Sequence, residues 1–313
     1  MDRALVILNP AAGRGFPSRT KRLIEDACER AGWTPVVVQT ERGRSIVDDV
    51  TENLERGVEH VIAAGGDGTV AAVATALIGS DVPLGIVPIG TGNVLARELG
   101  IPVSAERAVR LIVEREQICE LDAMQIMDRA YFLNASIGFS SLVVDSTDRL
   151  EKQFMGRTAY VWNGWLNLFG LQRYRFAIDI DGIHQRVRAS EVLVLNTAGL
   201  GEPIVRVPDV LPDDGKLCVC IIRARNLVDW FLLGADFLMG KRDSARHITL
   251  EPAYESIHVV ADSPLPTQAD GEVLGNSEID LRLVPRAVRV IVPANRSEPS
   301  LRLPRMVMGG QSR

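Results

Sequence analysis

The sequence predicts an α/β + β chain: an N-terminal α/β domain with a parallel sheet, followed by a C-terminal, mostly antiparallel β-sandwich domain. Three observations predict it. Short apolar runs alternate with helix-like stretches in the first third of the chain. Two-residue alternation typical of antiparallel strands replaces them after about residue 125. Glycine-rich turns follow the apolar runs of the first part, where a parallel strand would turn into a helix.

The elements of the first domain follow in order from their apolar spacing. Continuous apolar runs predict buried strands at 4–8, 35–38, 58–64 and 84–88. Helical spacing between them predicts a helix from Ser18, and further helices over about 47–54, 70–78 and 93–99. Gly32 and Gly57 are placed to end the first two helices in the left-handed conformation. Apolar strands in this alternation predict a parallel sheet covered by helices on both faces.

The second half of the chain is rich in strands. Residues 174–180 alternate, and Asp181-Gly182 is typical of a hairpin turn. Further strand-like runs lie at 191–196, 217–222, 247–250, 256–261, 279–284 and 288–292. Two helical stretches interrupt them, near 152–171 and 227–240. This pattern favours an antiparallel sandwich, with a barrel as the alternative.

The domain boundaries follow from the change of pattern. We expect a first domain over residues 1–124 and a second over 125–289. The C-terminal segment, about 290–313, is a candidate to return to the first domain.

Composition limits the function classes. The chain has 313 residues, of which 46% are hydrophobic and 24% charged, with a net charge of -5. This acidic balance argues against a nucleic-acid partner. The cysteines form no CxxC pair, which fits a reducing, cytoplasmic compartment. The longest apolar candidate for a membrane segment, 227–240, is too short to span a bilayer and carries two aspartates, so we expect at most peripheral contact at the inner face of the membrane.

The first glycine-rich turn, Gly65-Gly66-Asp67-Gly68-Thr69, follows the third apolar run. Glycines let backbone N–H groups approach phosphate oxygens, and the helix that follows adds its dipole. Asp67 is a candidate Mg²⁺ ligand, and Thr69 is a candidate helix cap or phosphate donor. Without further signals, the same residues would serve an ordinary strand-to-helix connection.

Two more turns end neighbouring strands. Gly90-Thr91-Gly92-Asn93 follows the fourth run, and we expect the Asn93 side chain to cap the helix after it. The third turn begins at Asn9-Pro10 and runs to Gly15, with Arg14 available for a phosphate. Ligands of open α/β sheets bind along the edge formed by the carboxyl ends of the strands. Three such turns therefore predict a nucleoside-triphosphate site.

These three motifs, in this order and spacing, resemble the diacylglycerol kinase catalytic-domain family, which includes bacterial soluble lipid kinases and the related sphingosine kinases. The likeness continues through residues 132–139, 212–217 and 270–272, so it covers roughly residues 4 to 292. The Gly-Gly-Asp-Gly-Thr block is shared with NAD kinases, but the full set is specific to the lipid kinases.

The resemblance implies a reaction in the cleft between the two domains, and it also implies the site residues. The residues implied to hold ATP are Asn9, Gly13, Thr40, Gly65, Gly66, Asp67, Gly68, Thr69, Val70, Ala71, Gly90, Thr91 and Asn93. Asp67 and Asp122 are implied to belong to the network around a catalytic Mg²⁺ ion. A structural Mg²⁺ is implied at the carboxylate of Asp214, with the backbone carbonyls of Leu211 and Lys216.

Glu272 is implied to be the general base. A lipid hydroxyl is a poor nucleophile at neutral pH, and a carboxylate in hydrogen-bond reach can take its proton as the phosphoryl group transfers. Asp270-Gly271-Glu272 supplies a second carboxylate, Asp270, beside it. From the residues alone, this tripeptide is equally a hairpin turn with an exposed acid.

The chain departs from the family pattern at two places. Many members continue the first glycine turn with Asn-Glu, where this chain has Ala71-Ala72. Many also have Asp after the Asn of the second turn, where this chain has Val94. The first change removes a polar contact to nucleotide, and the second removes a member of the Mg²⁺ network. Asp67 and Glu272 are retained, so activity is still expected.

The leading hypothesis is therefore an ATP- and Mg²⁺-dependent lipid kinase of phospholipid biosynthesis that converts diacylglycerol to phosphatidic acid. The alternatives are a sphingoid-base or other lipid kinase, an NAD kinase, and a nucleotide-binding regulator without catalysis. Residues 154–171, with Trp162 and Trp165, fit either an interfacial helix or a core-facing one. The oligomeric state stays open, with a homodimer as one alternative.

Overall fold

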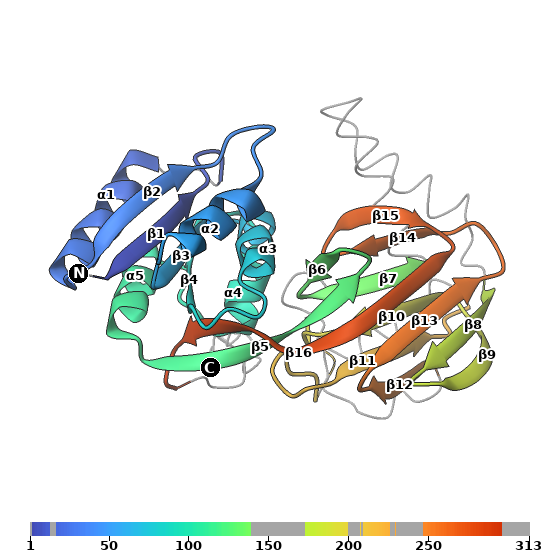
Figure 1. Cartoon of the computed structure of the whole chain (residues 1–313). Coiled ribbons are helices and arrows are strands. Elements are labelled where there is room, and N and C mark those ends of the chain that lie inside the picture. Colours follow the sequence, from blue (N-terminus) through green and yellow to red (C-terminus); the bar gives the residue numbers. More distant parts are fainter. Residues whose placement is uncertain are drawn as a thin grey trace, which may run out of the picture.

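The computed structural model describes residues 2–12, 17–138, 173–199, 207, 209–225, 229 and 247–295. Within these residues the chain forms two lobes, joined where two strands cross between them (Figure 1). The predicted helix near 152–171 lies outside the described residues, and so does the one near 227–240 apart from Asp229. Gly13 and Arg14 lie outside them as well.

The first domain contains the predicted parallel sheet, in the order β2-β1-β3-β4. Its strands are β1 (Arg3–Leu8), β2 (Thr34–Gln39), β3 (His60–Gly65) and β4 (Leu84–Pro88). β3 and β4 are buried along their whole length, as their continuous apolar sequences require. The four strands lie close to their predicted positions.

The helices cover both faces of this sheet, which confirms the α/β prediction. They are α1 (Pro17–Arg30), α2 (Ile46–Glu55), α3 (Asp67–Ala76), α4 (Val94–Glu98) and α5 (Ala105–Glu114). α1 packs against α5, and α2 packs against α3. Gly32 and Gly57 end α1 and α2 with φ values of 79° and 76°, so both helix stops are confirmed.

The second domain consists of antiparallel strands, as predicted. A six-stranded sheet has the order β12-β11-β10-β7-β14-β15, and β13, β8 and β9 continue the larger sheet. The bounds are β7 (Asn134–Gly138), β8 (Tyr174–Ile180), β9 (Ile183–Ala189), β10 (Glu191–Leu195), β11 (Leu217–Ile222), β12 (Ile248–Ala253), β13 (Ser256–Ala261), β14 (Pro266–Ala269) and β15 (Glu272–Asn276). Asp181 and Gly182 form the predicted β8–β9 hairpin turn, with φ of 52° and 85°.

Two strands belong to both domains. β5 (Gln117–Ile126) and β16 (Glu278–Val292) pair along most of their length, and β5 also pairs with the short β6 (Arg129–Tyr131). The end of β16 also pairs with β4, while its beginning pairs with β13. We expected separate strands at 279–284 and 288–292; instead, one strand carries a register shift between Val284 and Val288. This irregularity lies where the ribbon passes from one lobe to the other (Figure 1).

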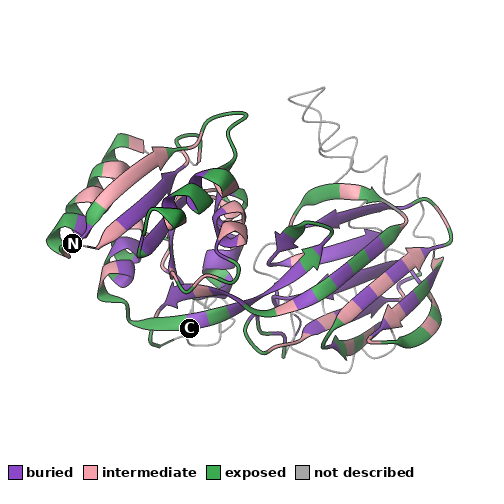
Figure 2. Ribbon diagram, in the orientation of Figure 1, coloured by how far each residue is buried: buried purple, intermediate pink, exposed green. Residues whose placement is uncertain are grey.

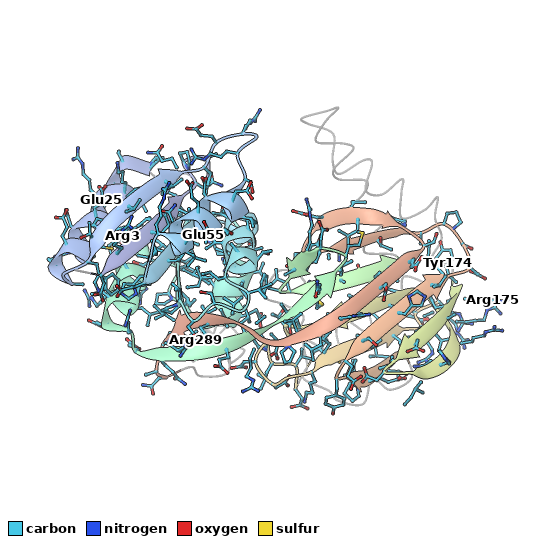
Figure 3. All side chains as sticks on the ribbon, in the orientation of Figure 1. Arg3, Glu25, Glu55, Tyr174, Arg175 and Arg289 are labelled. Atoms are coloured by element: carbon cyan, nitrogen blue, oxygen red, sulfur yellow. The ribbon has the colours of Figure 1, made fainter. Side chains whose placement is uncertain are left out.

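Each domain has its own core. One cluster of buried apolar residues fills the first domain, and another fills the space between the sheets of the second. Figure 2 shows the buried strands inside each lobe, and the more exposed surfaces of the helices and outer strands around them. At the base of the first lobe, Arg289 of β16 reaches the Asp81 carboxylate at 3.3 Å (Figure 3). Among the described residues, no helix combines the length and apolar composition needed to cross a bilayer.

Candidate functional site

The site begins at the carboxyl ends of β1 and β3, which are neighbours in the sheet although β2 separates them in sequence. The chain leaves β1 toward β2 on one side and leaves β3 toward β4 on the other, which makes this point a topological switch. Asn9 follows β1, and its Nδ2 donates a 3.0 Å hydrogen bond to Thr69 Oγ1 in α3. The Asn9 backbone N–H donates to Ala64 at 2.9 Å. The first and third predicted turns are therefore joined directly.

Thr40 lies on the same edge of the sheet. It follows β2, and its backbone N–H donates to the carbonyl of Leu8 at 2.9 Å. The ends of β1, β2 and β3 thus form one continuous rim.

The two glycine turns pack against each other through their backbones. A Cβ on Gly90 would lie 2.5 Å from the Gly66 Cα, closer than any side chain allows. A Cβ on Gly65 would lie 2.5 Å from the Thr69 side chain. The backbone N–H of Ile89 also donates to Gly65 O at 3.1 Å. Glycine is required at position 90 because the Gly66 backbone occupies the space of a side chain there, and at position 65 because the Thr69 side chain does.

Asp67 connects the two turns. It lies in the first turn of α3, and its Oδ1 accepts a 3.2 Å hydrogen bond from the N–H of Leu95 in α4. A Cβ on Gly92 would lie 3.0 Å from Asp67 Oδ2, so the second oxygen lies beside the second turn. Asp67 thereby supplies an acceptor to the first turn of α4.

Both predicted side-chain caps are wrong. Asn93 occupies the N-cap position of α4 in the left-handed region, with φ of 50°, but its side chain makes no cap bond. Instead its Oδ1 accepts from Gly90 N at 2.9 Å and its Nδ2 donates to Gly90 O at 2.8 Å, which closes the turn. Thr69 is a buried residue inside α3, whose N-cap is Gly66. Its hydroxyl is bonded to Asn9.

The opposite wall comes from the second domain. Asp270 and Gly271 form a two-residue turn between β14 and β15, with φ of 48° and 86°. The Asp270 carboxylate accepts backbone hydrogen bonds from three consecutive residues that link β6 to β7: Phe132 (2.8 Å), Leu133 (2.9 Å) and Asn134 (3.0 Å). This carboxylate holds two segments of the wall together.

Burial raises the pKa of Asp270 to about 6, although the three N–H groups oppose the shift. The negative charge of Asp67 adds to the rise, which means the two carboxylates interact across the space between the domains. Because its oxygens already accept backbone hydrogen bonds, Asp270 supports the wall and is poorly placed to take a substrate proton.

Glu272 lies two residues further, at the start of β15, and its carboxylate is exposed. Its Oε2 lies 3.1 Å from Nη1 of Arg129, the first residue of β6. The side chain of Arg129 also interacts electrostatically with that of Tyr131, which raises the pKa of the guanidinium. Burial raises the pKa of Tyr131, and the charges of Glu272 and Asp270 act in the same direction. The tyrosine therefore stays a neutral hydrogen-bonding group at physiological pH.

A cavity of about 250 Å³ lies between these walls. One side is formed by α3 with contributions from α2 and α4, and the other by residues 129–133 and the β14–β15 turn. Its lining residues are Val47, Asp67, Gly68, Ala71, Ala72, Thr75, Leu95, Arg129, Ala130, Tyr131, Phe132, Leu133, Asp270 and Glu272. Five predicted site residues thus share one cavity: Asp67, Gly68, Ala71, Asp270 and Glu272.

The other predicted residues of the nucleotide site that the structure describes lie along the carboxyl edge of the sheet, next to this cavity. Asn9 and Thr40 end their strands there, and Val70 is buried under the first turn of α3. Gly90, Thr91 and Asn93 belong to the turn that packs on Gly66. Sequence reasoning missed Arg129 and Tyr131, which lie on a three-residue strand without a motif. The alternation of β6 beside the Phe-Leu-Asn block is the only signal that could have suggested them.

Asp122 is not among the residues that line the cavity. It is fully buried in β5, and its Oδ2 accepts from Gly215 N at 2.7 Å while its Oδ1 accepts from Arg286 N at 2.8 Å. Burial raises its pKa, and the charges of Asp214 and Asp213 contribute to the rise. The structure thus places Asp122 with the loop of the predicted structural metal, away from the cavity lining.

That loop offers hard oxygen ligands. Asp214 Oδ2 lies 3.3 Å from Lys216 Nζ, and Asp214 Oδ1 accepts from Lys216 N at 3.3 Å. Three carboxylates, those of Asp122, Asp213 and Asp214, interact here. A divalent cation on Asp214 and loop carbonyls such as that of Leu211 would relieve this repulsion, so the donor set fits Mg²⁺.

Two domain families match the chain. A diacylglycerol kinase catalytic domain matches residues 3–126. A YegS C-terminal NAD kinase beta sandwich-like domain matches residues 134–292. The two matches coincide with the α/β lobe and the antiparallel lobe.

Relatives match along both lobes. A probable lipid kinase YegS-like of Enterobacter sp. (strain 638) is 30% identical over 249 residues, covering 78% of this chain and 81% of the relative. A probable lipid kinase YegS of Escherichia coli O127:H6 is 28% identical, covering 93% of this chain and 96% of the relative. A diacylglycerol kinase structure from Bacillus anthracis str. Sterne superposes with a TM-score of 0.71 at 21% identity, covering 93% of this chain and 96% of that one. At that identity the superposition supports the fold alone.

Proposed function

Because the chain belongs to the YegS-like lipid kinase family, we propose that it transfers the γ-phosphoryl group of ATP to a lipid hydroxyl, with diacylglycerol as acceptor and phosphatidic acid as product. The observation that carries the proposal is the shared cavity. Asp67 and Gly68, from the first glycine turn, line the same 250 Å³ space as Glu272 of the second domain. A phosphate donor and a proton acceptor therefore face each other.

The first lobe supplies the donor side. ATP phosphates would lie over the first glycine turn, where the N-terminal N–H groups of α3 are available and the packed glycines leave room for close approach. Asp67 is the carboxylate on this side, and it would hold the Mg²⁺ ion that neutralises charge on the phosphates. Its Oδ1 already accepts from Leu95 N, so Oδ2 is the atom that faces the second turn.

The second lobe supplies the proton acceptor. Glu272 is exposed to the cavity on a strand, and it is free of the backbone bonds that occupy Asp270. It would take the proton of the lipid hydroxyl as the phosphoryl group transfers. Asp270 fixes the wall that carries Glu272, and so sets its distance from Asp67.

The lining supports an apolar acceptor. Ala71 and Ala72 face a wall that includes Phe132 and Leu133. Such a surface suits the glycerol and first methylenes of a lipid better than a nicotinamide dinucleotide. The cavity volume fits the reactive head of a lipid, with the acyl chains extending outside.

The test is a panel of acceptors with labelled ATP and Mg²⁺, with products identified by mass spectrometry. The panel contains diacylglycerol, monoacylglycerol, sphingosine and NAD. Phosphatidic acid from diacylglycerol is expected, and Glu272→Gln should reduce turnover by about 10²–10⁴-fold. Label transferred to NAD would revive the NAD kinase reading. ATP binding by calorimetry without transfer to any acceptor would make the chain a regulator and overturn the proposal.

A further inference from the structure

The cavity has an uneven charge. Its described lining contains three carboxylates, those of Asp67, Asp270 and Glu272, and one cation, Arg129. A reaction that delivers a phosphate monoester into this space would add further negative charge. Arginine recognises phosphate through parallel N–H donors in a planar fork, and a phosphoryl group in transfer needs such donors. Arg129 is the lining side chain that can meet that requirement.

Arg129 is held weakly enough to change partner. The Arg129 side chain is 66% exposed and the Glu272 side chain is 60% exposed, so water screens their 3.1 Å contact. Exposed pairs of this kind add little to stability. The contact engages Nη1, and the guanidinium has five N–H donors in all. Donors therefore remain for a second anion without any change in the fold.

Tyr131 fixes the strand that carries Arg129. Its side chain interacts electrostatically with Arg129, and Tyr131 itself is a buried residue of β6 packed in the second core. Both residues line the cavity. The buried tyrosine thereby fixes β6, and with it the backbone of Arg129, at the cavity wall, while most of the arginine side chain is exposed to solvent.

We propose that Arg129 is a phosphate-binding residue of this cavity: it pairs with Glu272 while the cavity is empty and binds the phosphate monoester of the product. The inference rests on the proposed kinase function and adds the group that recognises its product. The exchange follows from the chemistry of the step.

In that step the lipid oxygen forms a bond to the γ-phosphorus, and its proton passes to the Glu272 carboxylate. The bond between the γ-phosphorus and the oxygen bridging to the β-phosphate breaks, and its electron pair leaves with ADP. Glu272 is then neutral and attracts Arg129 less, while the new monoester carries negative charge nearby. The Arg129 guanidinium therefore moves from the neutral Glu272 carboxyl group to the negatively charged phosphate monoester.

A purely structural role for Arg129 makes a different prediction. If the arginine only held Glu272 in place, its loss would lower turnover and leave the affinity for a phosphate monoester unchanged. If Arg129 binds phosphate, its loss lowers the affinity for the monoester and leaves the affinity for the uncharged diacylglycerol unchanged. Lysine keeps the charge but not the fork, so it should restore part of the affinity.

The experiment is calorimetric titration of the full chain, with ADP and Mg²⁺ present. The probes are a short-chain phosphatidic acid below its micelle concentration and the diacylglycerol of the same acyl chains. The variants are Arg129→Gln and Arg129→Lys. Arg188→Gln is the matched control. Arg188 is an exposed arginine of β9 that lies opposite Arg175 in the β8–β9 register, and Arg175 lies at the far end of the second lobe (Figure 3).

Arg129→Gln should lower the affinity for phosphatidic acid roughly 10-fold or more. The affinity of Arg129→Lys should lie between those of Arg129→Gln and the unmodified chain. Arg188→Gln should bind like the unmodified chain, and diacylglycerol affinity should not change. Equal phosphatidic acid affinity in Arg129→Gln and the unmodified chain would overturn the proposal, as would no binding by either. The readout is binding and does not depend on turnover. If the unmodified chain fails every kinase assay but Arg129→Gln still weakens its binding of phosphatidic acid, the proposed function is refuted and the role of Arg129 is not.

Discussion

The Oδ1 atom of Asp67 accepts a hydrogen bond from the backbone N–H of Leu95, at 3.2 Å. This bond joins the first turn of α3 to the first turn of α4, and so joins the two glycine-rich motifs that the sequence separates. The same carboxylate faces the cavity. Asp67 therefore has a structural bond and a proposed metal-binding role on different oxygens.

The two roles of Asp67 can be separated by substitution. Asp67→Ala removes the acceptor for Leu95, and it should lower the free energy of unfolding by about 1 kcal/mol and abolish turnover. Asp67→Asn keeps an acceptor oxygen, so it should melt near the unmodified chain while losing at least roughly 100-fold in turnover. Thermal melts and kinase assays on both variants check this. Near-normal turnover in Asp67→Asn would remove Asp67 from the metal site.

The glycines of the two turns should differ in tolerance. Gly90→Ala places a Cβ 2.5 Å from the Gly66 Cα, so the turns must separate, and the free energy of unfolding should fall by about 1–3 kcal/mol. Gly68 meets nothing within 4 Å and lies in α3, so Gly68→Ala should be neutral or stabilising by up to about 1 kcal/mol. Denaturant unfolding measures both.

Gly68→Ala should nevertheless lower the affinity for ATP, because Gly68 lines the cavity where the phosphates would approach. Calorimetry with ATP and Mg²⁺ tests this second half. ATP affinity unchanged by Gly68→Ala would place the phosphates elsewhere on the rim.

The bond between Asn9 and Thr69 should stabilise the rim. Thr69→Val keeps the shape but leaves the half-buried amide of Asn9 without its acceptor, at a cost of about 1–3 kcal/mol in the free energy of unfolding. Thr69→Ser retains the hydroxyl and serves as the control, with a smaller loss. Equal stabilities for the valine and serine variants would show that the 3.0 Å bond contributes nothing.

Magnesium should stabilise the loop that contains Asp214. If a cation binds there, millimolar Mg²⁺ should raise the melting temperature of the unmodified chain, and removal of divalent ions with EDTA should reverse the rise. Asp214→Asn should abolish this shift. Asp67→Asn retains the loop and should keep it, which separates the two proposed metal sites. A shift that survives Asp214→Asn would argue against the loop site.

His60 predicts a pH dependence of stability. It stacks on Trp33 with ring centroids 3.9 Å apart, and burial, helped by the charge of Arg115, lowers its pKa below the usual 6.5. The unfolded chain therefore takes up the proton first. The contribution of His60 to the free energy of unfolding should be fully present above about pH 6.5 and should be lost as the pH falls below that value.

The control is His60→Gln, compared with the unmodified chain by thermal melts at pH 7.5 and 5.5. The variant should be less stable at pH 7.5 and should lose less on acidification. Comparison between the two chains cancels other groups such as Asp270, whose raised pKa favours the folded state as the pH falls through about 6. Identical losses in the two chains would exclude His60 as the source.

The first domain could be predicted closely because its signals are local. Apolar runs fix β3 and β4, and Gly32 and Gly57 occupy positions where only a left-handed residue ends the helix. The glycine turns could likewise be placed at one edge of the sheet, since parallel strands share that edge. These elements depend on residues that are near one another in the sequence.

The rest depends on contacts between distant segments. Nothing in Asp270-Gly271-Glu272 indicates that one carboxylate accepts three N–H groups from residues 132–134 while the other stays exposed. The position of Asp122 beside Gly215 and Arg286 could not be predicted for the same reason. The helix cap predicted for Asn93 was wrong for a similar reason. Asparagine is a common capping residue, but its amide bonds instead to the backbone N–H and carbonyl of Gly90 in the turn that it closes.

The shared ribbon of β5 and β16 makes the two lobes inseparable. A fragment that stops after β5 would leave β4 without the neighbour that residues near Val290 provide, and a fragment that starts later would deprive β16 of its longest pairing. Neither half can thus be expected to fold when expressed by itself. Any approach of one lobe to the other must instead twist this paired ribbon, whose pairing is interrupted at the register shift between Val284 and Val288.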